Sequence, residues 1–409
     1  METIGRNAKI ASRTLARASS EQKNDMLMAI AKAILEHEHE IIVENAKDVM
    51  MAKINGMKLS LIDRLALNHD RIVAMHDSVL EIASLEDPIG EILSKTVRPN
   101  GLVIEKRRVS MGVIGIIFEA RPNVTVDVAA LCLKAGSTVI LKGGSDAVFS
   151  NIALANVMRE AISGVDKNCI QLIEDTSRES TMKLMKMNEY VDLLIPRGGA
   201  GLIRAVVENA TVPVIETGTG NCHIYVDESA DVEMAVNILI NAKTQRTGVC
   251  NAAETLLVHK NIADVFLPKA YDSLFEKGCE VRGCDICRSY SEKVLPATDK
   301  DYATEFLDLI ISVKVVENID EAITHINEYS TGHSETIITK DENNKELFFN
   351  EIDSAAVYAN ASTRFTDGGE FGFGAEMGIS TQKMHARGPM GLREITTFKY
   401  VISGDGQIR

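Results

Sequence analysis

The sequence predicts an α/β fold with two Rossmann-like domains, each built around a parallel sheet. Three observations lead to this prediction. From residue 111 onward, short apolar runs alternate with stretches of helical periodicity, in two successive series. Continuous apolar strands separated by helices are typical of parallel sheets that are covered on both faces. With 409 residues, the chain is long enough for two or three domains with separate cores.

The N-terminal part, residues 5–85, is predicted to be helical. Apolar residues recur there at spacings of three and four, as at Met26, Ala29, Ile30, Ala33 and Ile34. The dipeptide Asn100-Gly101 then predicts a hairpin turn, because both turn positions favour positive φ. The strands expected on either side of this turn are residues 96–97 and 102–104.

Two α/β series follow. The first has expected strands at 113–118, 138–141, 191–195 and 212–215, and expected helices at 125–135, 146–163 and 200–209. The second has expected helices at 231–243, 261–276, 319–328 and 342–350, and expected strands at 255–259, 308–315, 335–339 and 355–359. A last strand, 396–402, follows a glycine-rich loop and is a candidate for pairing outside its own domain.

The composition argues against several classes of protein. A formal net charge of −14 does not suit a nucleic-acid-binding protein with a basic surface. No stretch reaches the roughly 20 apolar residues that a membrane span needs, and Met1 to Lys9 lack the apolar core of a signal peptide. Seven cysteines, an odd number without a small-domain framework, fit a reducing compartment. We therefore expect a cytoplasmic protein.

Two glycine-rich turns follow predicted strands of the first series. In each, a basic residue follows the predicted strand and a helix follows the glycines: Lys142-Gly143-Gly144-Ser145 and Arg197-Gly198-Gly199. Ser145 is a candidate N-cap, and backbone amides at the start of a helix bind anions. Two such turns in one sheet favour a phosphorylated ligand, although each alone is equally consistent with a capped turn. No Gly-x-Gly-x-x-Gly fingerprint follows a strand in this chain.

Cys250 is the candidate nucleophile. It follows Gly248 and Val249 in a segment without strong apolar periodicity, which indicates an exposed thiol. If the segment forms a helical turn, Arg246 shares a face with Cys250. A neighbouring guanidinium lowers a thiol pKa, and only the thiolate attacks well. Together with the carboxylates of Glu216 and Glu305, this thiol indicates covalent catalysis on an acyl group.

The other cysteines have simpler interpretations. Cys132, Cys169 and Cys222 suit inert core positions, and the same interpretation is the alternative for Cys250. Cys279, Cys284 and Cys287 have the C-x4-C-x2-C spacing of plant-type iron–sulfur proteins, but no further cysteine follows them. We therefore expect no metal site.

Three segments give the chain a resemblance to a known family. They are residues 118–125 (FEARPNVT), 244–251 (TQRTGVCN) and 325–335 (HINEYSTGHSE). With these motifs the whole chain resembles the aldehyde dehydrogenase superfamily and, within it, the gamma-glutamyl phosphate reductase family. The resemblance implies an aldehyde-dehydrogenase-like fold with three parts. These are an NADPH-binding domain of residues 1–228 with 360–368, a catalytic domain of residues 229–359, and an oligomerisation arm of residues 97–110 and 369–409.

The resemblance also implies a reaction. L-glutamyl 5-phosphate and NADPH would give L-glutamate 5-semialdehyde, phosphate and NADP, the second step of proline biosynthesis from glutamate. Cys250 would be the nucleophile, Asn123 and the Cys250 backbone N–H would form the oxyanion hole, and Glu216 would be a third catalytic residue. Arg121 and Arg246 are candidates for binding the substrate, because an arginine fork binds two oxygens of a phosphate or carboxylate.

The family also indicates where the cofactor, NADPH, would bind. The implied cofactor-binding residues are Lys142, Gly143, Ser145, Arg197, Gly198, Gly199 and Glu305. In NAD-using relatives the third position after the strand-end lysine is often a glutamate, whereas Ser145 leaves room for a 2′-phosphate that Lys142 attracts. A homo-oligomer is implied as well, and glutamate 5-kinase is a candidate partner. Nucleic acid, a membrane and a metal are not expected.

Two alternatives stay open. A hydrolytic aldehyde dehydrogenase would share the fold but release a free acid, with Glu216 activating water. A binding protein without catalytic activity would also share the fold, although the joint presence of Cys250, Asn123 and Glu216 speaks against it. Phosphate dependence of the oxidative reaction separates the first alternative from the reductase. Thiol alkylation with and without substrate separates the second.

Overall fold

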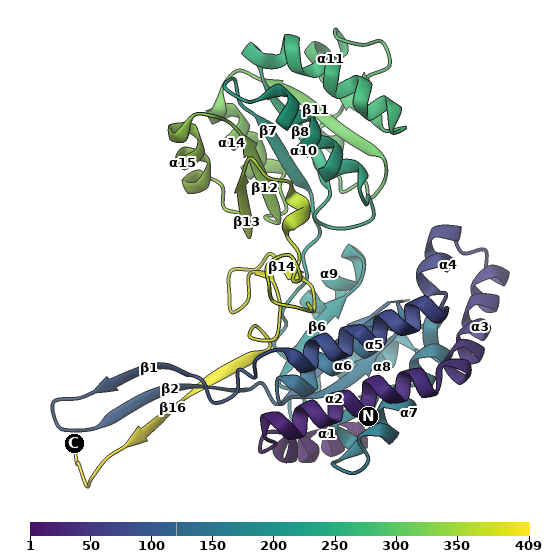
Figure 1. Cartoon of the computed structure of the whole chain (residues 1–409), viewed down its shortest axis with the longest axis vertical. Helices are drawn as coiled ribbons and strands as arrows, with labels where there is room; N and C mark the ends of the chain where they lie inside the picture. Colours follow the sequence, from purple (N-terminus) through teal and green to yellow (C-terminus); the bar gives the residue numbers. More distant parts are fainter. Residues whose placement is uncertain (120) are drawn as a thin grey trace. The chain divides into compact units, whose positions relative to one another are not determined.

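The computed structural model describes residues 1–119 and 121–409, and the chain forms two compact units (Figure 1). The first unit comprises Met1–Thr217, Gly372–Gly378 and Met390–Arg409, and the second comprises Gly218–Phe371 and Ile379–Pro389. Ala120, within the 118–125 motif, lies outside the described residues. Among the described helices, none is both long and apolar enough to cross a membrane.

The first unit begins with helices, as the periodicity of residues 5–85 predicts. They are α1 (Glu2–Leu15), α2 (Ser20–Glu36), α3 (Glu38–Ile54), α4 (Leu59–Leu65) and α5 (His69–Ser84). Ser19 and Gln22 form a capping box at the start of α2, in which each side chain accepts a hydrogen bond from the other residue's backbone N–H. The buried face of α2 carries Met26, Ile30 and Ile34, so the spacing that predicts the helix also packs it.

A four-stranded parallel sheet forms the centre of the first unit. Its strands lie in the order β5-β4-β3-β6, with the bounds Val113–Phe118 (β3), Thr138–Lys142 (β4), Ile170–Leu172 (β5) and Leu193–Arg197 (β6). The helices between and after these strands are α6 (Pro122–Lys134), α7 (Val148–Ala161), α8 (Arg178–Leu184) and α9 (Ala200–Asn209). Every residue of β3 is buried, as expected for an inner strand of a sheet with both faces covered.

The strand expected at residues 212–215 is reduced to a single bridge between Val214 and Leu194. The carbonyl of Pro213 accepts a hydrogen bond from the Leu194 N–H at 2.8 Å. Proline has no N–H with which to continue a ladder. The prediction of a full strand there is therefore wrong.

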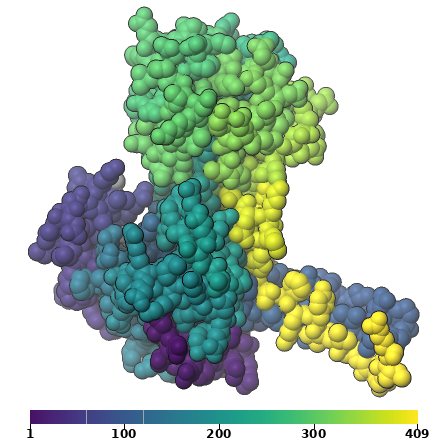
Figure 2. Space-filling model, turned by 180° about the vertical axis from the view of Figure 1, so that it is seen from behind, coloured from purple at the N-terminus to yellow at the C-terminus, as the bar shows by residue number. Residues whose placement is uncertain are grey.

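Three antiparallel strands of the first unit form an arm, which Figures 1 and 2 show from opposite sides. Their order is β1 (Ile92–Val97), β2 (Val103–Ser110) and β16 (Thr396–Ser403). The hairpin at Asn100-Gly101 is confirmed, and Gly101 has a positive φ of +88°. Asn100 does not have a positive φ, so the expectation that both turn positions have one is wrong for Asn100. The predicted C-terminal strand is confirmed too, and it pairs with β2 along its whole length.

The second unit contains a seven-stranded parallel sheet in the order β10-β9-β11-β8-β7-β12-β13. The strands are β7 (Cys222–Val226), β8 (Ala253–His259), β9 (Glu280–Gly283), β10 (Leu295–Pro296), β11 (Ile310–Val316), β12 (Ser334–Ile338) and β13 (Ala356–Ala359). The helices are α10 (Val232–Thr244), α11 (Lys260–Glu276), α12 (Asp285–Arg288), α13 (Asp299–Tyr302), α14 (Ile319–Tyr329) and α15 (Glu342–Glu351). A short antiparallel pair is formed by β14 (Ile379–Ser380) and β15 (Gly388–Pro389).

These elements confirm the second predicted series and add β7, β9, β10, α12 and α13, which the sequence analysis does not predict. β7 pairs with β8 on one side and with β12 on the other, so it belongs to the second sheet. The units consequently divide between Thr217 and Gly218, whereas the sequence places a boundary after residue 228.

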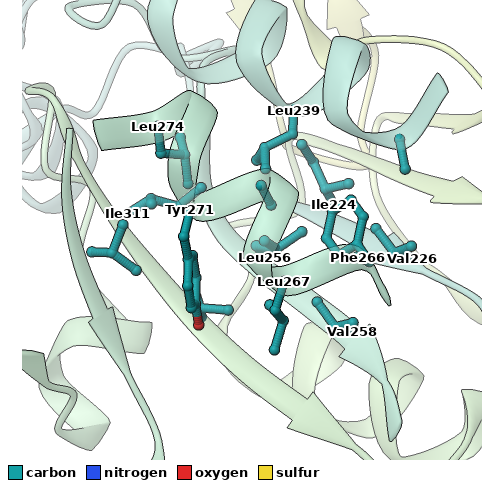
Figure 3. Close-up of a cluster of buried hydrophobic side chains, with 14 of the residues drawn as sticks. Ile224, Val226, Leu239, Leu256, Val258, Phe266, Leu267, Tyr271, Leu274 and Ile311 are labelled. Atoms are coloured by element: carbon teal, nitrogen blue, oxygen red, sulfur yellow. The ribbon is translucent and has the colours of Figure 1, made fainter. Parts of the chain in front are cut away.

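The largest apolar cluster of the second unit lies between its sheet and the helices α10 and α11. Figure 3 shows Phe266, Leu267, Tyr271 and Leu274 of α11 packed against side chains of β7, β8 and β11. Burying one such side chain contributes about 1.5–3 kcal/mol. This core fixes β7 and β8, whose amino ends carry part of the candidate site.

Candidate active site

Cys250 lies in the loop between α10 and β8, at the edge of the sheet where the strands begin. Because β7, β8 and β12 run parallel as neighbours, the segments that precede them meet at this edge. Those segments are residues 218–221, 250–252 and 331–333. Cys250 is half-buried, whereas Cys132, Cys169 and Cys222 are buried.

Gly220 brings the backbone of residue 250 into close contact with the segment before β7. A Cβ atom at position 220 would lie 1.4 Å from the Cys250 carbonyl oxygen, so no other residue fits without moving the loop. The same carbonyl oxygen accepts a hydrogen bond from the Cys222 Sγ at 3.2 Å. The Gly220 N–H donates to Glu305 Oε1 at 2.8 Å. The backbone that carries the thiol is therefore fixed on this side.

The 325–335 motif holds the Gly220 loop, residues 218–221, in place. The Thr331 hydroxyl donates to the carbonyl of Thr219 at 2.6 Å and accepts from the Asn221 N–H at 3.0 Å. The Asn221 side-chain amide donates to two backbone carbonyls at 2.7 and 2.8 Å, those of Tyr302 and Tyr329. This part of the motif therefore positions the loop that touches Cys250.

Two carboxylates hold the segment before β11. Glu254 Oε1 accepts a hydrogen bond from the Leu307 N–H at 3.1 Å, and the Lys243 ammonium donates to its other oxygen. Lys243 and Glu254 are fully buried. Burial raises the pKa of Glu254 to about 7, and Lys243 opposes this rise. Burial also raises the pKa of Glu305 against the effect of the Gly220 N–H, so Glu305 is a desolvated carboxyl beside the Gly220 loop.

Asn251 ties the Cys250 loop to residues 363–366. Its side-chain amide donates to the carbonyl of Thr366 at 2.8 Å, and its backbone carbonyl accepts from the Thr363 hydroxyl at 2.7 Å. The Arg364 guanidinium donates to the Asn251 side-chain oxygen. The Cys250 loop is thus held on both sides.

The charge of the Arg364 guanidinium acts on Cys250. Burial and the neighbouring charge of Arg246 lower the pKa of Arg364, while the attraction of Cys250 opposes this. The attraction is mutual, so Arg364 stabilises the Cys250 thiolate. The sequence does not indicate Arg364, because it lies far along the chain and only the fold brings it to this loop.

The helical turn expected between Arg246 and Cys250 does not form. Helix α10 ends at Thr244, and bends and a turn follow up to residue 250. The condition for Arg246 and Cys250 to share a helical face is therefore not met, since the chain leaves the helix before Arg246. Arg246 is exposed.

In the first unit, the glycine-rich turns lie at the edge of the sheet where the strands end. Lys142 ends β4, and its Nζ donates to the carbonyl of Gly143 at 3.2 Å. It is only 3% exposed, and burial lowers its pKa. This ammonium is therefore buried against its own turn.

Ser145 is exposed, but it does not cap the following helix. Helix α7 begins at Val148, and the N–H groups of Phe149 and Ser150 donate to the Asp48 carboxylate at 3.2 and 2.8 Å. The predicted N-cap is wrong, because a buried carboxylate from α3 satisfies these donors instead.

The turn after β6 also holds a carboxylate. The Gly199 N–H, at the start of α9, donates to Glu119 Oε2 at 3.0 Å. A Cβ atom at Gly198 would lie 2.7 Å from Glu119 Cδ, so a side chain there would push the Glu119 carboxylate aside. Both helix starts that the sequence proposes for anions thus carry carboxylates of the chain itself.

The remaining predicted residues of the first unit lie near α6 and after β6. Asn123 is exposed in the first turn of α6 and donates to Asp127 Oδ2 at 3.1 Å, and Arg121 immediately precedes that helix. Arg197 lies close enough to oppose the rise that burial causes in the pKa of Asp127. Glu216 is half-buried and precedes Thr217 at the end of this part of the unit.

Comparisons with known proteins identify relatives along the whole chain. The profile described as the aldehyde dehydrogenase family matches residues 1–277 and 298–401. A gamma-glutamyl phosphate reductase of Caldanaerobacter subterraneus subsp. tengcongensis is 59% identical over 100% of this chain and 99% of the relative. One of Carboxydothermus hydrogenoformans is 58% identical over 99% of this chain and 98% of the relative.

Solved structures extend the likeness to the fold. The crystal structure of a gamma-glutamyl phosphate reductase from Thermotoga maritima matches with a TM-score of 0.98 and 52% identity, over 100% of this chain and 99% of that one. An acetylating aldehyde dehydrogenase from Geobacillus thermoglucosidasius matches with a TM-score of 0.71 over 100% of this chain and 97% of that one. At 17% identity, this second likeness concerns the fold alone.

Proposed function

The chain belongs to the aldehyde dehydrogenase family and, within it, to the gamma-glutamyl phosphate reductases, and from this premise we propose that it reduces L-glutamyl 5-phosphate to L-glutamate 5-semialdehyde with release of phosphate. The family and fold that the motifs predict are confirmed. The protein is an oxidoreductase, and its family implies a nicotinamide cofactor. In the proposal, the reaction is the second step of proline biosynthesis from glutamate.

The observation that carries the proposal is the half-buried Cys250 thiol on a loop held from both sides, with the charge of Arg364 acting on it. The thiolate attacks the carbonyl carbon of the acyl phosphate, the bond from that carbon to the phosphate oxygen breaks, and phosphate leaves with the bonding electrons. A thioester on Cys250 remains. When bound, the cofactor supplies a hydride to the thioester carbon. Release of the aldehyde breaks the carbon–sulfur bond and restores the thiolate.

Guanidinium groups near Cys250 suit the two charged ends of this substrate. Arg246 and Arg364 lie close enough for their charges to interact. A guanidinium fork binds two oxygens of a phosphate or carboxylate at once. We propose that these arginines bind the substrate, and the proposal keeps the family's roles for Arg121, Asn123 and Glu216.

The proposed cofactor is NADPH, and the residues after β4 fit it in part. Ser145 is small and exposed at the carboxyl edge of the sheet, and it leaves room for a 2′-phosphate where a glutamate would repel it. Lys142 is buried against Gly143, so the discrimination rests on Ser145. Ser145→Glu should raise the KM for NADPH while leaving the KM for NADH unchanged, and Ser145→Ala should change neither. Equal efficiency of the native enzyme with both cofactors would contradict the preference.

The arm is the proposed route of self-association. β1 and β16 are the edge strands of its three-stranded sheet, and Val97, Tyr400 and Ile402 are at least 60% exposed on it. Unpaired edges and exposed apolar side chains suit pairing with another copy. The double variant Tyr400→Lys/Ile402→Lys should sediment as a monomer at micromolar concentration. Ile408→Lys, a change of an exposed residue beyond the strand, should leave the native oligomer intact, and a monomeric native chain would refute the proposal.

The oxidative reaction tests the proposed function. L-glutamate 5-semialdehyde and NADP are mixed with the enzyme in the presence and absence of phosphate. Steady formation of NADPH should require phosphate, because phosphate must cleave the thioester. Steady turnover without phosphate, with glutamate as product, would identify a hydrolytic dehydrogenase instead.

A further inference from the structure

A pair of cysteines plays no part in the proposed reaction. Cys284 and Cys287 follow the carboxyl end of β9, whereas Cys250 precedes the amino end of β8, so they lie at the opposite edge of the same parallel sheet. The Sγ atoms of Cys284 and Cys287 are 3.4 Å apart. A disulfide needs about 2.05 Å, so the two sulfurs must come closer before they can form a bond.

The two thiols differ in access and in acidity. Cys284 is half-buried, and Cys287 is completely buried. The hydrogen bond with Cys287 holds the pKa of Cys284 below its ordinary value, and the N–H groups of Cys287 and Ile286 add to this effect. The same bond and burial raise the pKa of Cys287. An accessible thiolate next to a protected thiol suits attack on an external disulfide followed by closure of an internal one.

A cavity of about 390 Å³ opens beside Cys284. Its walls include four carboxylates, those of Asp285, Asp299, Glu321 and Glu328. The one lysine of the wall, Lys314, pairs with Glu321 at 3.0 Å. The cavity is therefore acidic, and it favours a cationic ligand over an anionic one.

His325 adds a neutral polar group to the same wall. It is 4% exposed, and burial lowers its pKa to about 3, so it carries no charge at neutral pH. Among the described residues, its Nε2 atom has no hydrogen-bond partner. The neutral ring therefore adds no positive charge that would offset the carboxylates of the wall.

We propose that Cys284 and Cys287 form a thiol–disulfide exchange site for small cationic disulfides that enter this cavity. The Cys284 thiolate attacks one sulfur of the external disulfide, whose sulfur–sulfur bond breaks, and the first thiol leaves as a thiolate that takes up a proton. Cys287 then loses its proton and attacks Cys284 Sγ, which forms the protein disulfide and expels the second thiol. The two cysteines lose two electrons and two protons, and the external disulfide becomes two thiols.

The test uses the full chain carrying Cys250→Ser, so that the proposed nucleophile does not react. The reduced protein is incubated with cystamine at pH 7 without oxygen, quenched with an alkylating agent and mapped by mass spectrometry. We expect a Cys284–Cys287 disulfide to form at least about tenfold faster than any modification of Cys279, because burial raises the pKa of that thiol to about 12. Glutathione disulfide, which is anionic, should react several-fold more slowly than cystamine. Added salt should bring the two reaction rates closer together, because it screens the charges of the cavity.

Two variants in the same Cys250→Ser background separate the steps. With Cys287→Ser, cysteamine should stay attached to Cys284. With Cys284→Ser, Cys287 should remain unmodified. The proposal is overturned if Cys284 reacts no faster than Cys279, if the mixed disulfide persists beside an intact Cys287, or if glutathione disulfide reacts as fast as cystamine at low salt. Because the main measurement uses the chain with both cysteines present, poor folding of either variant does not obscure it.

Discussion

The two units carry their candidate functional residues at opposite edges of their parallel sheets. In the first unit, Lys142 and Arg197 end strands, and the turns that follow lie at the carboxyl edge. In the second unit, Gly220, Cys250 and Glu305 lie in segments that precede strands, at the amino edge. Ligands of open α/β sheets usually bind outside the carboxyl ends. The Cys250 thiol therefore lies at the amino edge of its sheet, where an ordinary dinucleotide-binding fold binds no ligand.

The two edges also differ in the groups that lie in close contact with their glycines. Gly220 makes room for the backbone of Cys250, whereas Gly198 makes room for the side chain of Glu119. The first contact fixes the loop of the proposed nucleophile, and the second places an exposed carboxylate on the start of α9. A glycine-rich turn in a sequence thus indicates a close approach, and the fold decides whether the approaching group is backbone or side chain. The predictions below test whether the amino edge carries the chemistry and the carboxyl edge the cofactor.

The largest expected effect follows from removing the thiol. Cys250→Ala should abolish reduction while NADPH binding and the thermal unfolding midpoint stay near native, because no other group replaces the nucleophile. Steady-state rates measure reduction, cofactor fluorescence measures NADPH binding, and thermal unfolding followed by circular dichroism gives the midpoint. Cys284→Ala is the matched control and should keep native activity. Appreciable turnover by Cys250→Ala would show that the nucleophile is not the thiol at the amino edge.

The next effect tests the support of the Cys250 loop. Gly220→Ala places a Cβ atom where the Cys250 carbonyl oxygen lies, so the loop must shift, and a misplacement of about 1 Å can cost about 10²-fold in rate. We expect that loss in kcat, and we expect circular dichroism to show that the secondary structure is retained. Gly164→Ala, at a position with nothing within 4 Å of its added Cβ, is the control. Native kcat in Gly220→Ala would show that the close contact is not needed.

A smaller effect is expected at Glu216. Activation of water would hydrolyse the thioester before the hydride arrives, so the reductive reaction does not need Glu216 as a base. Glu216→Gln should therefore lose only about tenfold to a hundredfold in kcat. Turnover should stay coupled to phosphate in the semialdehyde oxidation assay. A variant as inactive as Cys250→Ala, yet folded and able to bind NADPH, would assign Glu216 an essential role.

The smallest effect concerns the carboxyl edge of the first unit. A cofactor phosphate that binds at the start of α9 must displace the Glu119 carboxylate from the Gly199 N–H. Glu119→Gln removes that charge, so the Kd for NADPH should fall about two- to fivefold, the usual size of a charge effect at a helix start. Cofactor fluorescence measures the change, and Glu160→Gln on exposed α7 surface is the control. Unchanged or weaker binding would place the phosphate elsewhere.

Much of the fold can be predicted from the sequence, because the residues with apolar periodicity are the ones that the folded helices and strands bury. The helix expected at 200–209 is α9 with the same bounds, and the one expected at 261–276 is α11 with one residue more. β7 escapes prediction because His223 and Tyr225 interrupt the apolar run directly after a glycine-rich segment. Only its pairing with two neighbouring strands shows that it is central.

The candidate site is harder to predict, since its residues are brought together by tertiary contacts. Cys250 and the 325–335 motif are recognisable in the sequence, but the hydrogen bonds of Thr331 and Asn221 that connect them depend on the parallel sheet. The Asp48 cap of α7 and the charge of Arg364 beside Cys250 come from distant parts of the chain. Local patterns therefore indicate the candidate nucleophile, and the fold shows which residues hold its loop.

The account's central claim is that Cys250 forms a thioester which phosphate, and not water, resolves. The most direct test mixes the enzyme with L-glutamate 5-semialdehyde and NADP in the absence of phosphate and follows NADPH on the millisecond scale, with mass spectrometry of the quenched protein. The account predicts a burst that approaches one NADPH per chain, an acylated Cys250 peptide and no further turnover until phosphate is added. Continued turnover without phosphate, or a burst that persists in Cys250→Ala, would contradict it.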